Sequence, residues 1–119
     1  MSFDFNSEKP IYVQLAEFIE DAVMSGAFAQ GSQVPSTTEI SVMYKINPAT
    51  ALKGINILVD EGILFKKRGV GMFVTEGAAN VIKDKRQESF YNSFVKSMLD
   101  EAQKLGLTKE DIIKMIERN

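Results

Sequence analysis

Small amide, hydroxyl and basic side chains occur close together near the middle of the chain. The segment from Ile46 to Gly62 begins with Asn47 and Pro48 and continues through Thr50 and Lys53. Asn, Thr and Lys side chains can hydrogen-bond base edges or phosphates, and small residues between them allow close approach. A helix with such a surface could enter a DNA major groove. Amphipathic helices with an Asn-Pro start are also common in ordinary soluble domains, so this segment alone does not decide the function.

Composition limits the other kinds of chemistry that the chain could perform. Its 119 residues include no cysteine and no histidine, which excludes disulfides, thiol chemistry, the usual zinc sites and histidine-based catalytic triads. The carboxylate pairs Asp60-Glu61 and Glu110-Asp111 lie near predicted helix ends, where solvation or capping explains them. We therefore predict that the protein is not an enzyme and needs no metal and no cofactor.

Charge is distributed unevenly along the chain. The net charge of −2 by itself argues against a nucleic-acid-binding protein. Residues 44–75, however, hold five basic and two acidic residues, whereas residues 1–43 hold one lysine and six acidic residues. Any phosphate-facing surface is therefore expected to be local, and its binding to be modest and sensitive to salt.

No segment of the sequence has the character of a membrane span or an export signal. Apolar runs stay well short of the roughly 20 residues that cross a bilayer, and the N-terminus is too polar and acidic for a signal peptide. We expect a cytoplasmic protein with no membrane partner. Residues 1–9 are expected to form a mobile leader.

The segment 46–62 is predicted to form one helix with a capping residue at each end. The Asn47 side chain can accept hydrogen bonds from the first backbone N–H groups, and Pro48 suits the first helical position because its missing N–H needs no partner there. Gly62 can close the helix in the left-handed conformation. An apolar stripe between these ends follows helical spacing: Ala51, Ile55 and Leu58.

Two further helices are predicted before this one. Pro10 begins a helix that runs to about Ser25, and residues 36–39, Ser-Thr-Thr-Glu, form a capping box that begins a second helix to about Tyr44. Only three residues, Lys45, Ile46 and Asn47, separate this second helix from the helix that begins at Pro48. Helices joined so closely cross at a large angle, which is the helix-turn-helix arrangement.

A basic hairpin is predicted directly after Gly62. Two short β-prone runs, Ile-Leu-Phe-Lys-Lys and Met-Phe-Val-Thr, are joined by residues 68–71, Arg-Gly-Val-Gly. Gln33-Val34 can add a very short strand. Glycines and cations at a hairpin tip are typical of a wing, and the order of helix, helix-turn-helix and basic hairpin predicts a winged helix, an α+β fold.

Here the sequence resembles a family, the GntR-type bacterial transcription regulators. The resemblance extends from Pro10 to Gly77 in the correct order and spacing. Many family members carry an arginine where this chain has Thr38, and often a polar or basic residue where it has Leu52, so fewer polar groups are left to contact bases. The matching residues are Pro10, Ile11, Tyr12, Gln14, Leu15, Ser25 to Gly31, Val34, Pro35, Ser36, Glu39, Ile40, Ile46, Asn47, Pro48, Thr50, Leu58, Glu61, Gly62, Arg68, Gly69, Gly71, Phe73 and Val74.

The resemblance implies a surface for double-stranded DNA that is built from three elements. The helix beginning at Pro48 would enter a major groove, Ser36 and Thr37 would meet phosphate, and the wing would lie along the backbone or in the minor groove. The preferred DNA sequence cannot be carried over from the family. The candidate DNA-binding residues are Ser36, Thr37, Thr38, Lys45, Asn47, Pro48, Thr50, Lys53, Lys67, Arg68, Gly69 and Gly71.

After Gly77 the character of the sequence changes. Residues 78–105 are compatible with a helix that Gly106 stops, and residues 108–111 cap a final helix. Their apolar face is too long for two helices to bury against each other. Either the helices fold back on the winged helix or they form a two-fold dimer, which the resemblance favours. The candidate dimerisation residues are Phe90, Phe94, Met98, Leu99, Ile112 and Ile116.

The prediction is a winged helix-turn-helix domain over residues 1–77 and a two-helix dimerisation extension over residues 78–119. The short, YtrA-like subgroup of the family fits best, because the extension leaves little room for an effector pocket. The resemblance implies a homodimeric repressor on a palindromic operator, with a transporter operon as its target. The alternative is a winged-helix protein-interaction module without specific DNA binding. Whether a small-molecule effector exists stays open.

Overall fold

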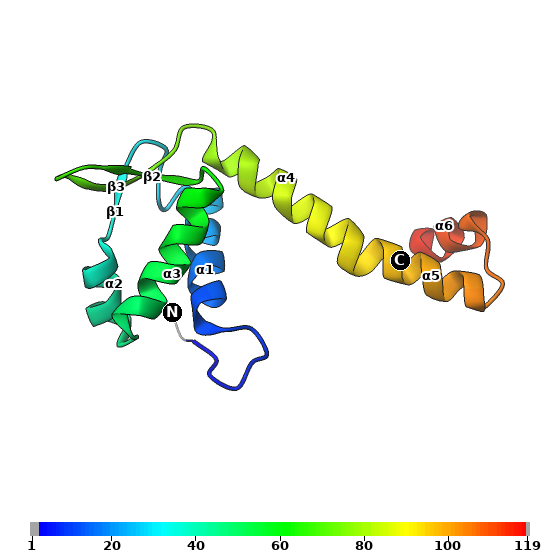
Figure 1. Cartoon of the computed structure of the whole chain (residues 1–119). Helices are drawn as coiled ribbons and strands as arrows, with labels where there is room; N and C mark the ends of the chain where they lie inside the picture. Colours follow the sequence, from blue (N-terminus) through cyan, green and yellow to red (C-terminus); the bar gives the residue numbers. More distant parts are fainter. Residues whose placement is uncertain (1–2, 119) are drawn as a thin grey trace. The chain divides into compact units, whose positions relative to one another are not determined.

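The computed structural model describes residues 3–118 (Figure 1). Contacts within the chain divide it into two compact units that meet in sequence between Lys83 and Asp84, and each unit is described by itself. The first unit has the α+β winged helix-turn-helix fold that the sequence predicts. The elements in chain order are α1 (Ile11–Ser25), β1 (Gln33–Val34), α2 (Thr37–Tyr44), α3 (Pro48–Asp60), β2 (Leu64–Lys67), β3 (Gly71–Val74), α4 (Ala78–Phe90), the π-helical η1 (Tyr91–Val95), α5 (Lys96–Lys104) and α6 (Lys109–Glu117).

Capping side chains fix where α2 and α3 begin. At α2 the Glu39 N–H donates to Ser36 Oγ over 3.1 Å, and the Ser36 N–H donates to Glu39 Oε1, also over 3.1 Å. At α3 the Ala49 N–H donates to Asn47 Oδ1 over 2.8 Å, with Pro48 at the first helical position. Both predicted caps are confirmed, and each satisfies backbone groups that a helix end leaves without an intrahelical partner.

Gly62 ends α3 as predicted. Its φ of 77° is left-handed, a region that glycine enters without steric cost. The Ile63 N–H donates to the Leu58 carbonyl over 2.9 Å, and the Gly62 N–H donates to the Val59 carbonyl over 3.0 Å. This pair of hydrogen bonds is a Schellman motif, and it leads the chain directly from α3 into β2.

A small antiparallel sheet lies at one end of the helices, with the strand order β1-β3-β2 (Figure 1). β2 and β3 form the predicted hairpin, with Phe65 opposite Phe73 and Lys66 opposite Met72. β1 is the predicted very short strand, and it pairs with the free side of β3. Because side chains alternate along a strand, Phe65 and Lys66 lie on opposite faces of the hairpin.

The core of the first unit joins α1, α3 and the sheet to the start of α4. The predicted apolar stripe of α3 is buried in it. Ala78 and Ile82 of α4 are also fully buried there, so the first turns of α4 belong to the winged-helix unit. The core residues are Leu15, Ala16, Ile19, Val23, Val34, Ile40, Ile46, Ala51, Ile55, Leu58, Ile63, Leu64, Val74, Ala78 and Ile82.

Helices α1 and α3 lie side by side (Figure 1) and pack closely at Gly54. A Cβ atom at Gly54 would lie 2.8 Å from the Tyr12 carbonyl oxygen and 3.1 Å from Leu15 Cδ2. A backbone carbonyl cannot rotate out of the way as a side chain can. Glycine inside a helix costs up to about 1 kcal/mol relative to alanine, and here the close packing of the two helices explains why it is present.

The sequence suggests a mobile leader at residues 1–9, but its described part, residues 3–9, makes defined contacts with α1 and α2. Phe3 packs edge-on against Tyr44, with 5.9 Å between ring centroids. The Asp4 N–H donates to Gln14 Oε1 over 2.9 Å, and Gln14 Nε2 donates back to the Asp4 carbonyl over 2.8 Å. The leader is therefore attached to the helix-turn-helix through both its side chains and its backbone.

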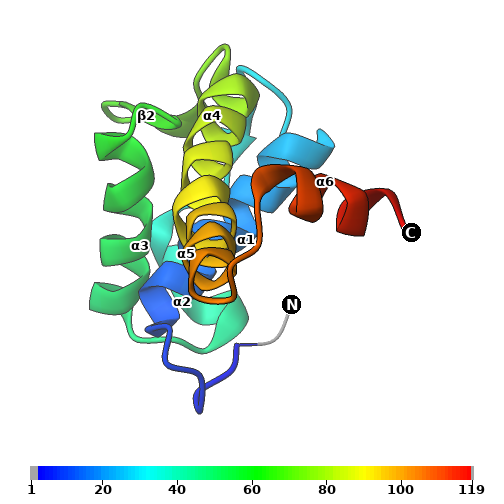
Figure 2. The same ribbon diagram turned by 90° about the vertical axis from the view of Figure 1, so that its right-hand side faces the viewer.

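The second unit contains the later part of α4 together with η1, α5 and α6, which turns back beside α5 (Figure 2). α4, η1 and α5 follow one another without a break and match the predicted helix over residues 78–105, although the sequence did not indicate the π-helical segment. Gly106, with a φ of 73°, ends α5 as predicted. The Leu107 N–H donates to the Ala102 carbonyl over 2.9 Å, which completes the turn towards α6.

Helix α6 begins at a second capping box, as predicted. The Thr108 N–H donates to Asp111 Oδ2 over 2.9 Å, and the Asp111 N–H donates to Thr108 Oγ1 over 3.1 Å. The hydrogen bonds from the Thr108 backbone and side chain lower the pKa of Asp111 below its ordinary value. Because the folded pKa is the lower one, this cap stabilises α6 above the ordinary carboxyl pKa and is lost as the pH falls through the folded value.

Candidate nucleic-acid interface

The exposed side of α3 carries small, amide and basic side chains. Ala49, Leu52, Lys53 and Asn56 are exposed and line a shallow depression on this side of the helix, which the exposed Asp60 closes at the end of α3. Thr50, a predicted contact residue, is half-buried. We call Ala49, Leu52, Lys53 and Asn56 the α3 ridge. It offers an amide and an ammonium group that can hydrogen-bond base edges or phosphates, and its first turn has no bulky side chain to prevent close approach.

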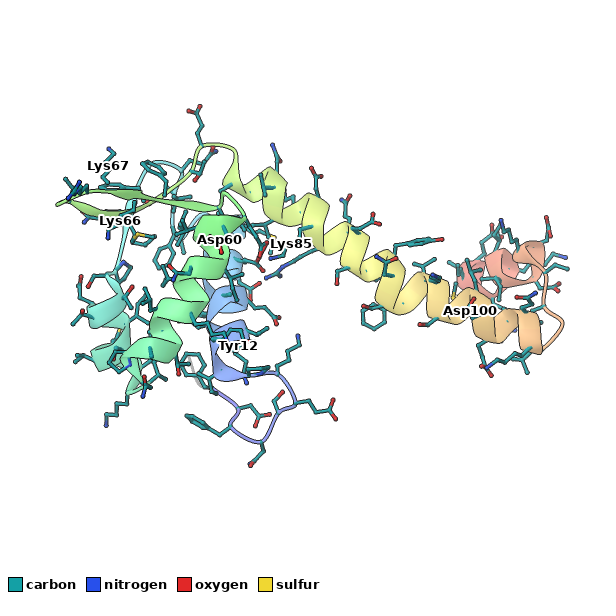
Figure 3. The ribbon with its side chains drawn as sticks, in the orientation of Figure 1. Tyr12, Asp60, Lys66, Lys67, Lys85 and Asp100 are labelled. Carbon is teal, nitrogen blue, oxygen red and sulfur yellow. The ribbon has the colours of Figure 1, made fainter. Side chains whose placement is uncertain are left out.

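Lys53 leans from the α3 ridge towards α1. Its Nζ lies 4.2 Å from the centroid of the Tyr12 ring, within the range of a cation–π interaction. Tyr12 is labelled on α1 in Figure 3. This contact places the Lys53 charge on the α1 side of the ridge and leaves Asn56 as the polar side chain between Lys53 and the hairpin.

A groove of about 320 Å³ lies between α2, α3 and the hairpin. It brings the predicted residues of α2 together with the predicted Gly71 of the wing, although they are far apart in the sequence. Its lining contains hydroxyl, amide and apolar groups and one ammonium group, and it contains no carboxylate. The lining residues are Ser36, Thr37, Thr38, Leu52, Ile55, Asn56, Val59, Lys66, Gly71 and Met72. We call it the α3–wing groove.

The N-terminus of α2 forms one wall of this groove. Ser36 Oγ accepts the capping hydrogen bond from Glu39, so its main role is to fix the start of the helix. Thr37 and Thr38 follow in the first turn and add their hydroxyl groups to the wall. The helix dipole favours an anion at this position, and the capping box already places the Glu39 carboxylate at the Ser36 N–H.

The turn between α2 and α3 is fixed by backbone geometry. Lys45 has a left-handed φ of 53°, which is unusual for a residue with a side chain. The Ile46 N–H donates to the Ser41 carbonyl over 3.1 Å, and Ser41 Oγ donates to the Ile46 carbonyl over 2.8 Å. Lys45, Asn47 and Pro48 are thereby exposed together beside the first turn of α3.

The two lysines of β2 lie on opposite faces of the hairpin (Figure 3). Lys66 is on the face turned towards α3 and lines the α3–wing groove. The Nζ of Lys67 lies on the other face, 4.5 Å from the centroid of the Phe73 ring and 5.9 Å from that of Phe65. The predicted contact residue Lys67 is therefore outside the groove, and Lys66, which was not predicted, is inside it.

The tip of the wing is attached to the neighbouring strand. Gln33 Nε2 donates to the Val70 carbonyl over 2.9 Å. A side chain at Gly71, whose φ is 144°, would collide with this Gln33 amide. Arg68 and Gly69 are exposed at the tip, and Gly69 has a left-handed φ of 77°. The hydrogen bond from Gln33 thus fixes the position of the wing tip, and Arg68 and Gly69 remain exposed to solvent.

The family model for bacterial regulatory proteins of the gntR family matches residues 11–74, which is more than half of the chain. The chain belongs to the GntR family. The match runs from α1 to β3, the elements that form the α3 ridge, the groove and the wing. The family assignment makes the chain a GntR transcriptional regulator with a DNA-binding domain, which agrees with the prediction that it is not an enzyme.

Two GntR relatives from Bacillus subtilis align with nearly the whole chain. The HTH-type transcriptional regulator YhcF is 35% identical over 118 residues, which cover 98% of this chain and 94% of YhcF. The HTH-type transcriptional repressor YtrA is 25% identical over 112 residues, which cover 94% of this chain and 85% of YtrA. The similarity therefore includes the second unit as well as the winged helix.

Solved GntR structures have the same fold. A GntR-family transcriptional regulator from Bacteroides thetaiotaomicron superposes with a TM-score of 0.79 at 30% identity, covering 92% of this chain and 95% of that one. The DNA-binding domain of AraR, solved in complex with operator ORX1, superposes with a TM-score of 0.57 at 27% identity, covering 63% of this chain and 93% of that one. A GntR winged helix of this kind implies binding to double-stranded DNA.

Sequence reasoning missed Asn56 and Lys66 as candidate residues of this GntR interface. Asn56 lies one helical turn after Leu52, and this spacing could have placed it on the exposed side of α3. Lys66 alternates with Phe65 and Lys67, but alternation alone does not tell which face of a hairpin is turned towards α3. Both residues line the α3–wing groove.

The second unit carries a separate apolar surface. Phe90, Phe94, Met98 and Ile116 are exposed, and the rings of Phe90 and Phe94 pack against each other with 5.6 Å between centroids. The other two candidate dimerisation residues are less accessible: Leu99 is half-buried and Ile112 is buried. Ile112 therefore supports this surface from inside the unit. We call the four exposed residues the apolar face.

Two further findings concern residues 3–118 only. None of the helices in this part is long and apolar enough to cross a membrane. In the same residues no three carboxylates are grouped so that they could hold a metal ion.

Proposed function

We propose that this GntR regulator is a repressor that acts as a homodimer on a palindromic operator, in the cytoplasm where bacterial DNA lies. The observation that carries the proposal is the continuous surface formed by the α3 ridge, the α3–wing groove and the wing tip. The relative YtrA is named a repressor, which supports repression rather than activation. The AraR domain was solved in complex with an operator, which supports operator DNA as the ligand of this chain.

Each part of this surface has a distinct role in the proposal. The α3 ridge enters a major groove, where Lys53 and the neighbouring Thr50 contact base edges or phosphates. Thr37 and Thr38 at the N-terminus of α2 meet a phosphate. The exposed tip residue Arg68 lies along the backbone or in the minor groove. Ser36, Asn47, Gly69 and Gly71 set the backbone positions from which these side chains reach the DNA.

The charge distribution explains why a dimer is needed. The segment that forms the recognition surface has an excess of basic residues, but the chain as a whole has a net charge of −2. A single winged helix with few cations should bind DNA weakly and lose affinity steeply with salt. Joining two such modules on a palindrome can raise the apparent affinity by roughly 10² to 10⁴ without any new contact.

The apolar face is the proposed dimer seam, and a second copy of the chain is its occupant. A two-fold axis through this face lets each residue meet the same surface of the partner, which is the commonest closed arrangement of soluble oligomers. Exposed aromatic residues that already pack against each other, such as Phe90 and Phe94, suit a seam of this kind. The same two-fold symmetry would be mirrored in the operator. We further propose a neighbouring transporter operon as the target.

The experiment that tests the function measures binding to the DNA upstream of the protein's own gene, against a scrambled duplex of the same length, at low and high salt. Preferential binding to the upstream DNA that weakens with salt is the expected result. Equal or absent binding on both duplexes would overturn the proposal and favour a protein-interaction module instead.

The dimer is tested separately by light scattering with a pair of matched variants. Phe94→Glu places a charge in the apolar face and should yield a monomer that binds the upstream DNA at least about 10²-fold more weakly. Phe5→Glu makes the same change at an exposed phenylalanine of the first unit, outside this face, and should remain a dimer. A wild-type protein that is monomeric at concentrations on the order of tens of micromolar would exclude the proposed dimer.

A further inference from the structure

We propose that Lys66 binds a DNA phosphate in the α3–wing groove and is the lysine of β2 that contacts DNA, whereas Lys67 makes no such contact. This inference deepens the proposed function and rests on it. It assigns a positioning residue that neither the family pattern nor the sequence singled out, and it specifies where one strand of the DNA backbone crosses the protein.

The surroundings of Lys66 favour this role. The residue is exposed, lies opposite Met72 in the hairpin and lines the groove. In the described part of the chain, neither a hydrogen bond nor an ion pair engages its ammonium group. A lysine that faces a concave surface without a protein partner is free to bind an anion there.

The chemistry of the groove matches a phosphate. Thr37, Thr38 and Asn56 supply groups that can donate hydrogen bonds, and the lining contains no carboxylate that would repel an anion. A phosphate oxygen placed near Lys66 would also face the N-terminus of α2, where the helix dipole favours negative charge. The Glu39 carboxylate lies at the same helix end but is held by the Ser36 N–H and does not line the groove. Hydroxyl, amide, ammonium and helix-end donors are the groups that contact phosphate oxygens in protein–DNA complexes.

The shape of DNA indicates which phosphate this is. In B-form DNA a major groove and the adjacent minor groove are separated by one sugar–phosphate strand. If α3 occupies the major groove and the wing tip approaches the adjacent minor groove, that strand must pass between them. The space between α3 and β2 is the α3–wing groove, and Lys66 is the cation that lines it.

Lys67 provides the contrast within the same strand. Its ammonium group lies over the Phe65 and Phe73 rings on the opposite face of the hairpin. Lys67 therefore lies on the face of the hairpin turned away from the α3–wing groove (Figure 3). Because Lys66 and Lys67 are adjacent and carry the same charge, replacing either one changes the long-range attraction for DNA almost equally, and a difference between the two variants reports direct contact.

The experiment compares Lys66→Ala with Lys67→Ala in the full-length protein. Fluorescence anisotropy measures the affinity for a duplex of random sequence over a series of salt concentrations, because a phosphate contact does not depend on sequence. For Lys66→Ala, the slope of log affinity against log salt concentration should become shallower by about 0.9 for each module on the DNA, the value for one phosphate that is no longer neutralised. Lys67→Ala should change this slope much less, because it alters only the long-range attraction, and Lys66→Arg should retain the wild-type slope.

Three outcomes would overturn the inference. The first is an unchanged slope for Lys66→Ala, and the second is an equal change of slope in both alanine variants. In both cases the proposed function is retained, provided that the wild-type protein binds DNA normally. A wild-type protein without salt-dependent DNA binding would overturn the inference and the proposed function together. Circular dichroism of each variant distinguishes these results from unfolding, which is not expected because both lysines are exposed.

Discussion

Replacing Gly54 with alanine should destabilise the protein, although helix propensity alone predicts the opposite. Alanine in a helix interior is favoured over glycine by up to about 1 kcal/mol. At this position, however, the new Cβ would lie 2.8 Å from the Tyr12 carbonyl oxygen and 3.1 Å from Leu15 Cδ2. The first of these contacts is with backbone, so relief requires α1 and α3 to move apart.

The two effects can be compared in magnitude. Overpacking of a core contact usually costs about 1–3 kcal/mol. Because the clash is with a backbone carbonyl, the upper part of this range, about 2–3 kcal/mol, applies. After subtraction of about 1 kcal/mol of helix propensity, we expect the free energy of unfolding to fall by about 1–2 kcal/mol. Moving α3 away from α1 would also disturb the contact between Lys53 and Tyr12, so DNA binding should weaken in the same variant.

Urea denaturation followed by circular dichroism measures the change in unfolding free energy. Asn56→Ala is a matched control on the same helix, because it improves helix propensity by up to about 0.7 kcal/mol at an exposed position where no clash arises. The control should be as stable as the wild type or slightly more stable. If Gly54→Ala were also as stable as the wild type, close packing against Tyr12 would not be the reason for glycine at this position.

Four further predictions concern DNA binding and the boundary between the two units. Arg68→Ala should weaken binding to related and unrelated DNA alike and reduce the log–log salt slope by about one unit for each phosphate that the arginine neutralises, measured by anisotropy. Thr50→Ala should leave the circular dichroism spectrum native-like. If Thr50 reads a base edge, this variant should lose about 1–3 kcal/mol of discrimination between operator and scrambled DNA. An equal loss of affinity for both duplexes would instead assign Thr50 to a phosphate contact. A chain ending at Lys83 should stay folded in denaturation experiments but become monomeric, with operator affinity lower by roughly 10² to 10⁴. A chain ending at Gly77 should in addition lose about 2–5 kcal/mol of stability, because it lacks the fully buried Ile82.

The ends of the helices could be predicted because capping is a local property of the sequence. Ser36, Asn47 and Thr108 each accept a hydrogen bond from an N–H two or three residues later, and Gly62 and Gly106 each adopt a left-handed φ. These features depend on a few neighbouring residues. They fixed the order of the elements, and with it the winged helix.

Features that depend on distant parts of the chain could not be predicted in this way. The sequence indicated that Gly54 is unfavourable in a helix but not that the Tyr12 carbonyl lies beside it. Lys66 and Lys67 have the same side chain, and only the packing of the hairpin on α3 places one of them in the groove. The π-helical segment η1 also had no recognisable local signal.

The hydrogen bond from Gln33 to the Val70 carbonyl has a consequence for the thermodynamics of DNA binding. A wing with a loose tip would lose conformational entropy when it settles on DNA, and this loss would reduce the affinity. Because the Gln33 amide already holds the tip to β1, much of that ordering takes place when the protein folds. If the wing contacts DNA as proposed, it does so preorganised, and Gln33 contributes to the strength of binding without any contact with DNA of its own.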